Sequence, residues 1–438
     1  MAEGRVAITG LGVVSPAGIG IDALWKALLA RDSHTRTLDA FDPGGFPCRI
    51  GAQIDGFSAR NFVPKTYRKS VKVMARDIEI AVGAADLALR DSGIVTEGID
   101  PAATTIDSDR LACNIGAGLI CTDLNELGVA LTTALDDDGV FSLRAWGEHG
   151  ITNLTPLWLL KYLPNMLSCH VTIIHAARGP SNTITCGDAS GHLAIGEASR
   201  LVARGGAEAA IAGGAETKIN PMGLMRQVLL KRVREGFDGE PTEACRPFDA
   251  GHAGTIVGEG GGLVVLENLA RAEARGARPY AEVVGFGSAC DPAGIDVTHA
   301  NAGSLDLAVA KALDDAQITP KDVGLIVTHG TAVPEEDRCE AAAWRNVFGD
   351  ALATIPACAI TGSVGSLFAG AGGVECAVAA MALKNQTVPP TVNHLSPAAG
   401  CELSFLAEPR ASELEYVVTG AFSVGGQSGA CVLRRCAS

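Results

Sequence analysis

Aromatic side chains are scarce in this chain, at 5% of its 438 residues, and long apolar runs are absent. No segment reaches the roughly 18 uninterrupted apolar residues that a membrane-spanning helix needs, so no membrane span is expected. Residues 1–20 also lack the basic start, long apolar stretch and cleavage site of a signal peptide. We therefore expect a cytoplasmic protein.

Paired cysteines are absent as well. The 13 cysteines are scattered singly, without a C-x-x-C pair, and their number is odd. This pattern argues against a disulfide framework or a structural zinc site and favours a reducing cytosol. Basic residues are outnumbered, since 35 Lys and Arg oppose 49 Asp and Glu to give a net charge of −14. Such a balance argues against a general nucleic-acid binder, although it permits a local basic patch.

Glycine and apolar residues are what the chain has in quantity, with 53 glycines and 47% hydrophobic side chains. Glycine together with alanine favours close packing and tight turns. Short β-rich runs alternate with helical stretches from end to end, which predicts an α/β fold with a mostly parallel, helix-covered sheet. The expected helices cover residues 70–91, 192–204, 303–316, 336–347 and 374–384.

Two segments of the chain resemble each other. Residues 6–20 (VAITGLGVVSPAGIG) and residues 281–296 (AEVVGFGSACDPAGID) are both β-rich runs that contain a glycine turn. The repetition predicts two related halves, residues 1–265 and 266–438. Residues 120–170 interrupt the first half without an equivalent in the second, and we expect this insertion to make tunnel or subunit contacts.

Five segments carry a resemblance to a known family. They are GPSNTITCGDASGHLAIGEASRLVARGGAEAAIAGGAET (179–217), RPFDAGHAGTIVGEGGGLVVLENLARAEARGARPYAEVVGFG (246–287), THGT (328–331), VPPTVN (388–393) and AFSVGGQSG (421–429). In this order, over nearly the whole chain, they resemble the β-ketoacyl-acyl-carrier-protein synthases. The resemblance implies a thiolase-like α/β fold whose two related halves form a five-layered α-β-α-β-α core, in a subunit that dimerises.

The resemblance also implies a chemistry. Family members condense an acyl thioester with a malonyl thioester on an acyl carrier protein, with loss of carbon dioxide and without a metal or other cofactor. The reaction needs a thiolate at a helix N-terminus, where the dipole lowers its pKa. It also needs two imidazoles that stabilise the enolate oxygen, a lysine that tunes one of them, and backbone N–H groups that form an oxyanion hole.

Most of these positions hold unsuitable residues here. By the resemblance, the nucleophile position holds Asp188 and the first histidine is His329. The lysine position holds Thr361, and the second histidine position holds Ser366. Val424 falls at the gating position of the C-terminal glycine loop, where its backbone N–H would join the oxyanion hole.

These substitutions predict that the isolated chain does not condense. An acyl-aspartate would be an anhydride, which hydrolyses far more readily than a thioester. Alternatives stay open for single residues. Asp188 could only cap a helix, His329 could be a hydrogen-bonded structural residue, and Cys186 could be a displaced nucleophile or an inert buried thiol.

Chain-length factors are a subgroup of the family that lacks the cysteine and pairs with an active synthase. Residues 251–262 and 333–349 resemble their segments, although Asp188 stands where those factors commonly carry Gln. The resemblance implies a heterodimer with a ketosynthase paralogue in type II fatty-acid, polyketide or polyene synthesis, in which this subunit shapes the acyl tunnel. The implied tunnel residues are Leu119, Ile120, Cys121 and Cys186.

Two other functions remain open, as does the question of whether the chain is an enzyme. The first is a homodimeric, diverged synthase that acts as an acyltransferase, decarboxylase or thioesterase through His329 and Asp188. The second is a non-catalytic acyl-binding protein.

Two basic clusters stand out against the acidic background. The first follows Pro64, which suits a helix start, and its spacing places its members near one helix face. It consists of Lys65, Arg68, Lys69 and Lys72. We predict that it docks an acidic acyl carrier protein, the alternative being an ordinary solvated helix face. The second patch of the same kind consists of Arg226, Lys231, Arg232 and Arg234.

Overall fold

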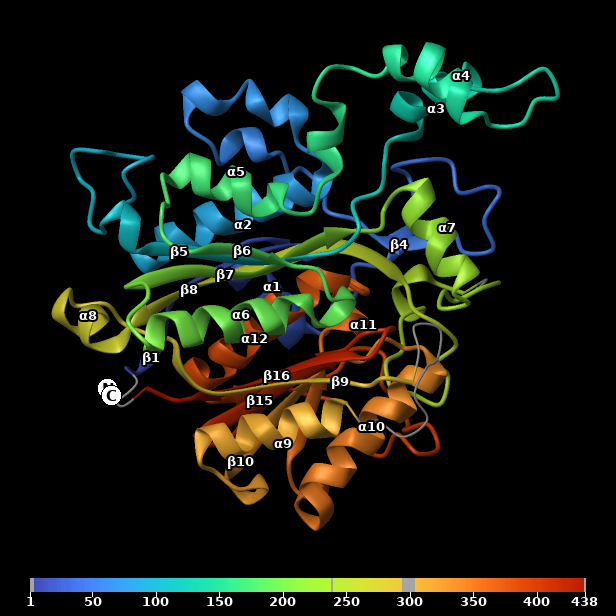
Figure 1. Ribbon diagram of the computed structural model, residues 1–438. Helices are drawn as coiled ribbons and strands as arrows, with labels where there is room; N and C mark the ends of the chain where they lie inside the picture. The colour runs from blue at the N-terminus through green and yellow to red at the C-terminus, as the bar shows by residue number, and fades with distance from the viewer. Residues whose placement is uncertain (1–3, 238, 294–303, 437–438) are drawn as a thin grey trace.

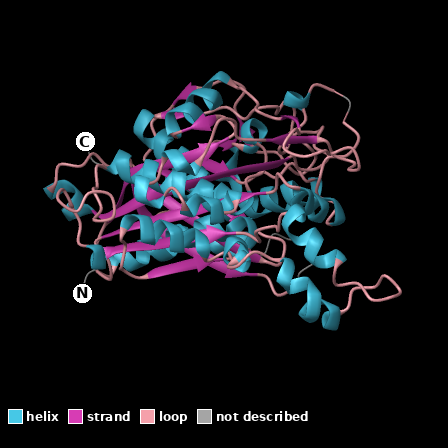
Figure 2. Cartoon of the chain, turned by 90° about the horizontal axis from the view of Figure 1, so that it is seen from above, coloured by secondary structure: helices cyan, strands magenta, loops and turns pink. Residues whose placement is uncertain are grey.

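The computed structural model describes residues 4–237, 239–293 and 304–436. Two sheets lie one above the other with helices between them, and further helices cover both outer faces (Figure 1). These five layers, in the order α-β-α-β-α, confirm the arrangement that the family resemblance implied. The prediction of a mostly parallel sheet is wrong, because antiparallel pairings are about as common as parallel ones across the two sheets. Seen from above, the layers form one continuous body from which an arm projects (Figure 2).

The first sheet has the strand order β1-β8-β7-β5-β6. β5 runs parallel to β6 and β7, whereas β8 runs antiparallel to β1 and β7. All strands except the edge strand β6 are almost fully buried, so they lack the apolar–polar alternation of a half-exposed strand. The bounds are β1 (Val6–Ser15), β5 (Leu111–Ala117), β6 (Ser181–Ile184), β7 (Ala209–Thr217) and β8 (Val257–Asn268).

The second sheet has the order β9-β16-β15-β10-β11-β13. β10 runs parallel to β11 and β15, whereas β16 runs antiparallel to β9 and β15. The bounds are β9 (Ala281–Cys290), β10 (Val323–Thr328), β11 (Pro356–Ala359), β13 (Ser404–Phe405), β15 (Tyr416–Phe422) and β16 (Gln427–Arg434). Shorter elements are β2 (Gly18–Ile19), β3 (Arg36–Thr37), β4 (Ile50–Ala52), β12 (Thr387–Val388), β14 (Arg410–Ala411) and α8 (Leu269–Ala274).

The two similar segments of the sequence lie side by side in the fold. The first segment begins with β1 and the second with β9, and these strands pair antiparallel from Val6 opposite Val283 to Ile8 opposite Ala281. This short ladder joins the two sheets edge to edge. Positions 294–296 of the second segment lie outside the described residues.

The central layer is built from helices rich in small residues. α12 (Ala371–Asn385) is buried around almost its whole circumference, as an apolar helix in a core must be. It packs against α6 (Ser190–Ala203), and a Cβ added at Gly372 would lie 2.5 Å from the backbone nitrogen of His192. Glycine is therefore required where the two helices approach. The same layer holds α1 (Ile21–Ala30) and α11 (Thr361–Val364).

The outer helices correct one prediction. α5 (Met166–His175) lies with α2 (Arg76–Ser92) on one side, and α9 (Leu305–Ala316) lies with α10 (Pro334–Phe348) on the other. The expected helix over residues 70–91 is wrong at its start. The chain is extended at Met74 and Ala75, so residues before them form two separate 3-10 turns, η2 (Lys65–Tyr67) and η3 (Ser70–Val73). The basic residues of this segment therefore do not share one helix face.

Residues 120–170 contain the projecting arm (Figures 1 and 2). It carries α3 (Leu124–Thr132), α4 (Leu143–Ala145) and the π-helical turn η5 (Trp146–Gly150), and it exposes large apolar side chains, among them Val140 at 61% and Leu143 at 79%. Its role in tunnel or subunit contacts stays a prediction. The division of the chain into two related halves also stays a prediction. The proposed boundary after residue 265 lies inside β8.

Among the described residues, no helix combines the length and the apolar character needed to cross a membrane.

Candidate functional site

Asp188 lies in the 3-10 turn η8 (Gly187–Ala189), which leads into α6, and its side chain is buried. Gly187 supplies the φ of +54° that the turn requires. The C-terminal glycine loop holds the turn from across the site, because the Ala189 N–H donates to Ser423 Oγ at 2.9 Å. Neither η8 nor α6 has a side-chain cap, so Asp188 does not act as the simple helix cap considered above.

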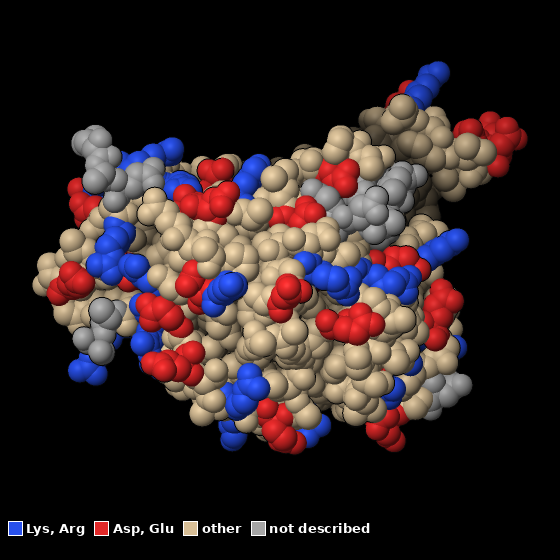
Figure 3. Space-filling view, turned by 90° about the horizontal axis from the view of Figure 1, so that it is seen from below, with Lys and Arg blue, Asp and Glu red and all other residues tan. Residues whose placement is uncertain are grey.

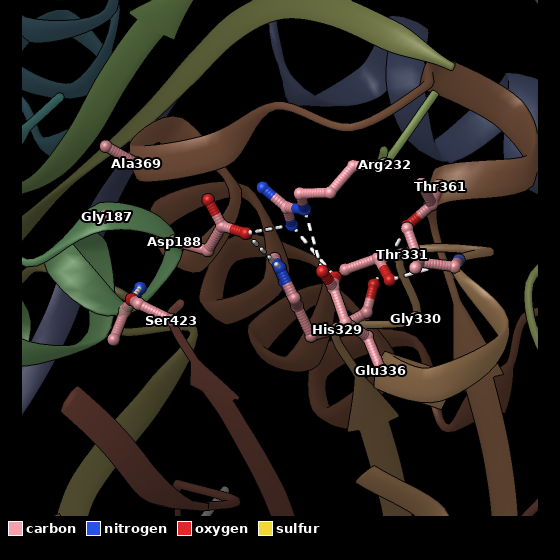
Figure 4. Close-up of polar contacts among 12 residues, drawn as sticks. Gly187, Asp188, Arg232, His329, Gly330, Thr331, Glu336, Thr361, Ala369 and Ser423 are labelled. Carbon is pink, nitrogen blue, oxygen red and sulfur yellow. Dashed lines mark hydrogen bonds and ion pairs between the residues drawn. The ribbon is translucent and has the colours of Figure 1, made fainter. Parts of the chain in front are cut away.

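The partner of Asp188 is Arg232 (Figure 4). Arg232 Nη2 donates to Asp188 Oδ2 at 2.8 Å and to Glu336 Oε2 at 2.9 Å, and Arg232 Nε donates to Glu336 Oε1 at 2.7 Å. All three side chains are buried. The prediction that Arg232 belongs to a basic surface patch is therefore wrong. A buried carboxylate at position 188 calls for a counter-charge, but the sequence does not show which distant residue supplies it.

The charges of this triad stabilise one another. Burial alone would raise the pKa of Asp188, but the positive charges of Arg232 and His329 outweigh burial and hold that pKa well below its usual range. Burial would likewise lower the pKa of Arg232, yet Glu336 and Asp188 raise it. Asp188 is thus a carboxylate engaged in an ion pair, which leaves it a poor nucleophile.

His329 follows β10 directly and lies between two carboxylates. Its Nδ1 is 2.9 Å from Glu375 Oε1, and its Nε2 is 3.6 Å from Asp188 Oδ2, an ion-pair distance longer than a hydrogen bond. Burial would lower the pKa of His329, but Glu375 and Asp188 together raise it well above its ordinary value. A charged imidazolium with a carboxylate near each nitrogen cannot accept another proton.

A second histidine, His192 on α6, lies next to Glu375, the partner of His329. His192 was not identified from the sequence. Its Nε2 is 3.0 Å from Thr419 Oγ1 and 3.4 Å from Glu375 Oε2. Burial, together with the positive charge of His329, lowers the pKa of His192 to about 3. His192 is therefore a neutral neighbour of the charged cluster.

Thr361 and Ser366 provide no acid or base. The Thr361 hydroxyl donates to the backbone carbonyl of His329 at 2.8 Å. Ser366 Oγ is buried and has no hydrogen-bond partner among the described residues. The structure thus places a threonine, rather than an amine, against the turn that carries His329.

Two acidic residues after His329 hold its turn. Glu340 accepts the N–H groups of His329 and Gly330, each at 2.8 Å, and Asp337 accepts the N–H of Ala332 at 3.0 Å. Burial raises the pKa of Glu340 to about 7. These carboxylates position the backbone of the turn that carries His329.

A cavity of about 440 Å³ opens beside Asp188. Of the predicted residues, Asp188, Leu119 and Val424 line it, whereas Ile120 is buried apart from it and Cys121 lines a neighbouring cavity of about 350 Å³. Cys186 is not among its described lining residues, and burial raises the pKa of the Cys186 thiol. Nothing in this environment activates Cys186 as a displaced nucleophile.

The first basic cluster lies outside this cavity. Lys65, Lys69 and Lys72 are exposed, and Arg68 is half-buried. Docking of a carrier protein there stays a prediction. Among the described residues, no group of three or more His, Cys, Asp or Glu side chains is arranged to hold a metal ion.

The chain is similar to known proteins along its whole length. Residues 3–272 match the family described as "Beta-ketoacyl synthase, N-terminal domain", and residues 280–395 match "Beta-ketoacyl synthase, C-terminal domain". A 3-oxoacyl-[acyl-carrier-protein] synthase 2 from Vibrio cholerae is 31% identical over 438 residues, which cover 99% of this chain and 100% of the relative.

Two solved structures show the same fold. The ishigamide ketosynthase/chain length factor is 25% identical with a TM-score of 0.84, and the match covers 100% of both chains. A β-ketoacyl synthase from Burkholderia phymatum is 28% identical with a TM-score of 0.85, covering 99% of this chain and 100% of that one. This chain, with its thiolase-like fold, therefore belongs to the β-ketoacyl synthase family.

Proposed function

We propose that this protein is a chain-length-factor-like subunit, which does not condense by itself but pairs with an active ketosynthase and shapes its acyl tunnel in type II fatty-acid or polyketide synthesis. One observation carries the proposal. Asp188, which falls at the family's nucleophile position, is held in a buried ion pair with Arg232 at 2.8 Å. A nucleophile engaged in this way cannot load an acyl group and release it again.

The surroundings of Asp188 support the same conclusion. His329 is charged and faces two carboxylates, so it cannot take up a proton during catalysis. Thr361 and Ser366 have no basic group with which to replace the family's lysine and second histidine. This arrangement disfavours those forms of the diverged-enzyme alternative, such as a thioesterase, that would use His329 as a general base.

Association with a second subunit has its own support. One of the similar solved structures is named as a ketosynthase/chain length factor. The arm exposes Val140 and Leu143, and β6 is an edge strand whose outer side pairs with no strand in the described part of the chain. Exposed apolar side chains and open strand edges are typical of surfaces that a partner covers. The 13 cysteines are scattered singly along the sequence, which suits the expected cytoplasmic setting.

Acyl carrier protein is the proposed mobile partner, with Lys65, Lys69 and Lys72 as exposed basic contacts. The face that α9 and α10 cover is less suited, because basic and acidic side chains are interspersed there (Figure 3).

The test is co-expression with a ketosynthase encoded beside this gene, followed by native mass spectrometry and a condensation assay. We expect a one-to-one complex that makes β-ketoacyl product from malonyl- and acyl-carrier protein, and no product from the isolated chain. Steady condensation by this chain alone would refute the proposal. Hydrolysis or transfer of acyl groups by the isolated chain would instead favour the diverged enzyme.

A further inference from the structure

A cavity of about 390 Å³ lies by the C-terminal ends of α2 and α5, the two helices that cover one side of the molecule (Figure 1). Its lining residues come from these helices and from the loop that follows α2. It shares no described lining residue with the cavity beside Asp188. The two cavities are therefore separate sites.

His175, the last residue of α5, brings an unused polar atom to this cavity. The residue is only 2% exposed, and its Nδ1 lies 3.1 Å from Thr96 Oγ1. Its Nε2 is buried as well and has no hydrogen-bond partner among the described residues. A buried polar atom without a partner costs free energy that a bound polar group would recover. Nε2 therefore marks the polar end of the site.

The charges around His175 favour a neutral ligand. Arg90 Nε lies 2.7 Å from Asp86 Oδ2, one turn earlier on α2, so the two charges offset each other. Burial and the positive charge of Arg90 lower the pKa of His175 to about 4, which leaves the imidazole neutral at pH 7. A charged ligand would lose its hydration in this cavity without gaining a free counter-charge.

The remaining wall is largely aliphatic. Leu89, Ile94, Val95 and Ile99 supply it, and Ile99 is 44% exposed, so a ligand that covers it removes apolar surface from water. An apolar cavity of about 150 Å³ already holds benzene, and the volume of about 390 Å³ here leaves room for two fused rings. A rigid ring system also loses less conformational entropy on binding than a flexible alkyl chain does.

We propose that this cavity binds a neutral ring compound that carries one hydroxyl group. The rings pack against the aliphatic wall, and the hydroxyl forms a hydrogen bond with His175 Nε2. A hydroxyl both donates and accepts hydrogen bonds, so it suits either tautomer of this histidine. The site is independent of the proposed chain-length role, because it lies outside the cavity beside Asp188.

Two probes test the site on the full chain by ligand-observed NMR titration. They are 5-indanol and indane, which have the same fused rings and differ only in the hydroxyl group. We expect 5-indanol to bind at least threefold more tightly, because only its hydroxyl pairs with Nε2. Equal binding of the two probes would show that water already satisfies Nε2, and this result or binding of neither probe would overturn the proposal.

Three variants locate the binding. His175→Phe keeps an aromatic ring without the polar atom and should abolish the preference for 5-indanol. Ile99→Asp leaves His175 in place but puts a charge in the aliphatic wall, so both probes should bind at least fivefold more weakly. His149→Phe is the matched control, because the His149 side chain is 69% exposed and lies on the arm. It should keep the preference.

The two site variants decide the outcome together. A preference that survives His175→Phe would place the hydroxyl elsewhere and overturn the proposal. Where His175→Phe does not fold, Ile99→Asp decides, and unchanged affinity for both probes in that variant would overturn the proposal as well. None of these results bears on complex formation with a ketosynthase, which native mass spectrometry measures separately.

Discussion

Arg232 joins residues from three distant parts of the chain. Its guanidinium lies between Asp188, at the start of α6, and Glu336, in α10, and all three are buried. Desolvating three charges is costly, and only their mutual pairing offsets that cost. The triad should therefore behave as a unit.

Removing Arg232 tests this unit. Arg232→Ala removes the cation of buried Glu336 and leaves Asp188 with His329 alone, and we expect the free energy of unfolding to fall by about 3–5 kcal/mol in urea denaturation. Arg144→Ala breaks only the exposed pair with Glu148 at 2.9 Å, and it should cost less than about 1 kcal/mol. Equal losses in the two variants would contradict the burial argument.

Restoring a thiol at position 188 should not restore condensation. In Asp188→Cys, Arg232 remains in place and favours the thiolate, so iodoacetamide should add one label beyond the wild-type pattern in intact-mass analysis. No β-ketoacyl product should form, because Thr361 and Ser366 still lack basic groups. Product formation by this single variant would show that the missing thiol was the sole defect.

His329 should make stability depend on pH in a defined direction. Its folded pKa is raised, mainly by Glu375 and Asp188 acting against burial. The stability from its charged form is therefore complete below the unfolded pKa of about 6.5 and is lost as pH rises toward the folded pKa. The advantage in melting temperature of wild type over His329→Gln should shrink from pH 6.5 upward. Parallel curves for the two proteins would contradict the charged state of His329.

At the scale of elements, the contact between α6 and α12 depends on missing side chains. A Cβ at Gly372 would lie 2.5 Å from the His192 nitrogen, whereas nothing lies within 4 Å of a Cβ at Gly128 in α3. We expect Gly372→Ala to lower the free energy of unfolding by about 1–3 kcal/mol. Gly128→Ala should be neutral or stabilising by up to about 1 kcal/mol. Urea denaturation of both variants checks the pair, and equal effects would contradict the close approach.

The prediction of helices from the sequence succeeded where the residue spacing is helical and the backbone follows it. It failed where the backbone is extended despite that spacing. The helical spacing over residues 76–92 is visible in the sequence, and α2 forms there. The prediction that this helix begins at residue 70 is wrong, because the backbone at Met74 and Ala75 is extended and separates the helix from the preceding turn. The basic cluster therefore lies on 3-10 turns, which periodicity does not reveal.

At the scale of the whole molecule, the arm leaves large apolar side chains exposed in the described part of the chain. Its apolar side chains, such as Leu143 at 79% exposed, gain nothing from contact with water. A second subunit that covers them would gain a stabilising free energy of about 25 cal/mol for each Å² of apolar surface removed from water.

A paired substitution tests the arm as a subunit contact. Val140→Asp combined with Leu143→Asp should weaken association at least tenfold in native mass spectrometry and leave the melting temperature of the isolated chain nearly unchanged. Leu395→Asp changes a side chain that is 77% exposed and lies in the C-terminal half. It should not affect association. Unchanged assembly in the paired variant would remove the arm from the proposed interface.

The sequence by itself determined the α/β class and the family, and it predicted which residues fall at the family's catalytic positions, because these depend on local patterns and on residue identity. Only the tertiary structure decided that Arg232 pairs with Asp188, that Glu375 and Asp188 keep His329 charged, and that Arg226 lines the cavity beside them. Ion pairs between residues tens to hundreds of positions apart depend on how the chain folds back on itself, and no pattern along the sequence records that.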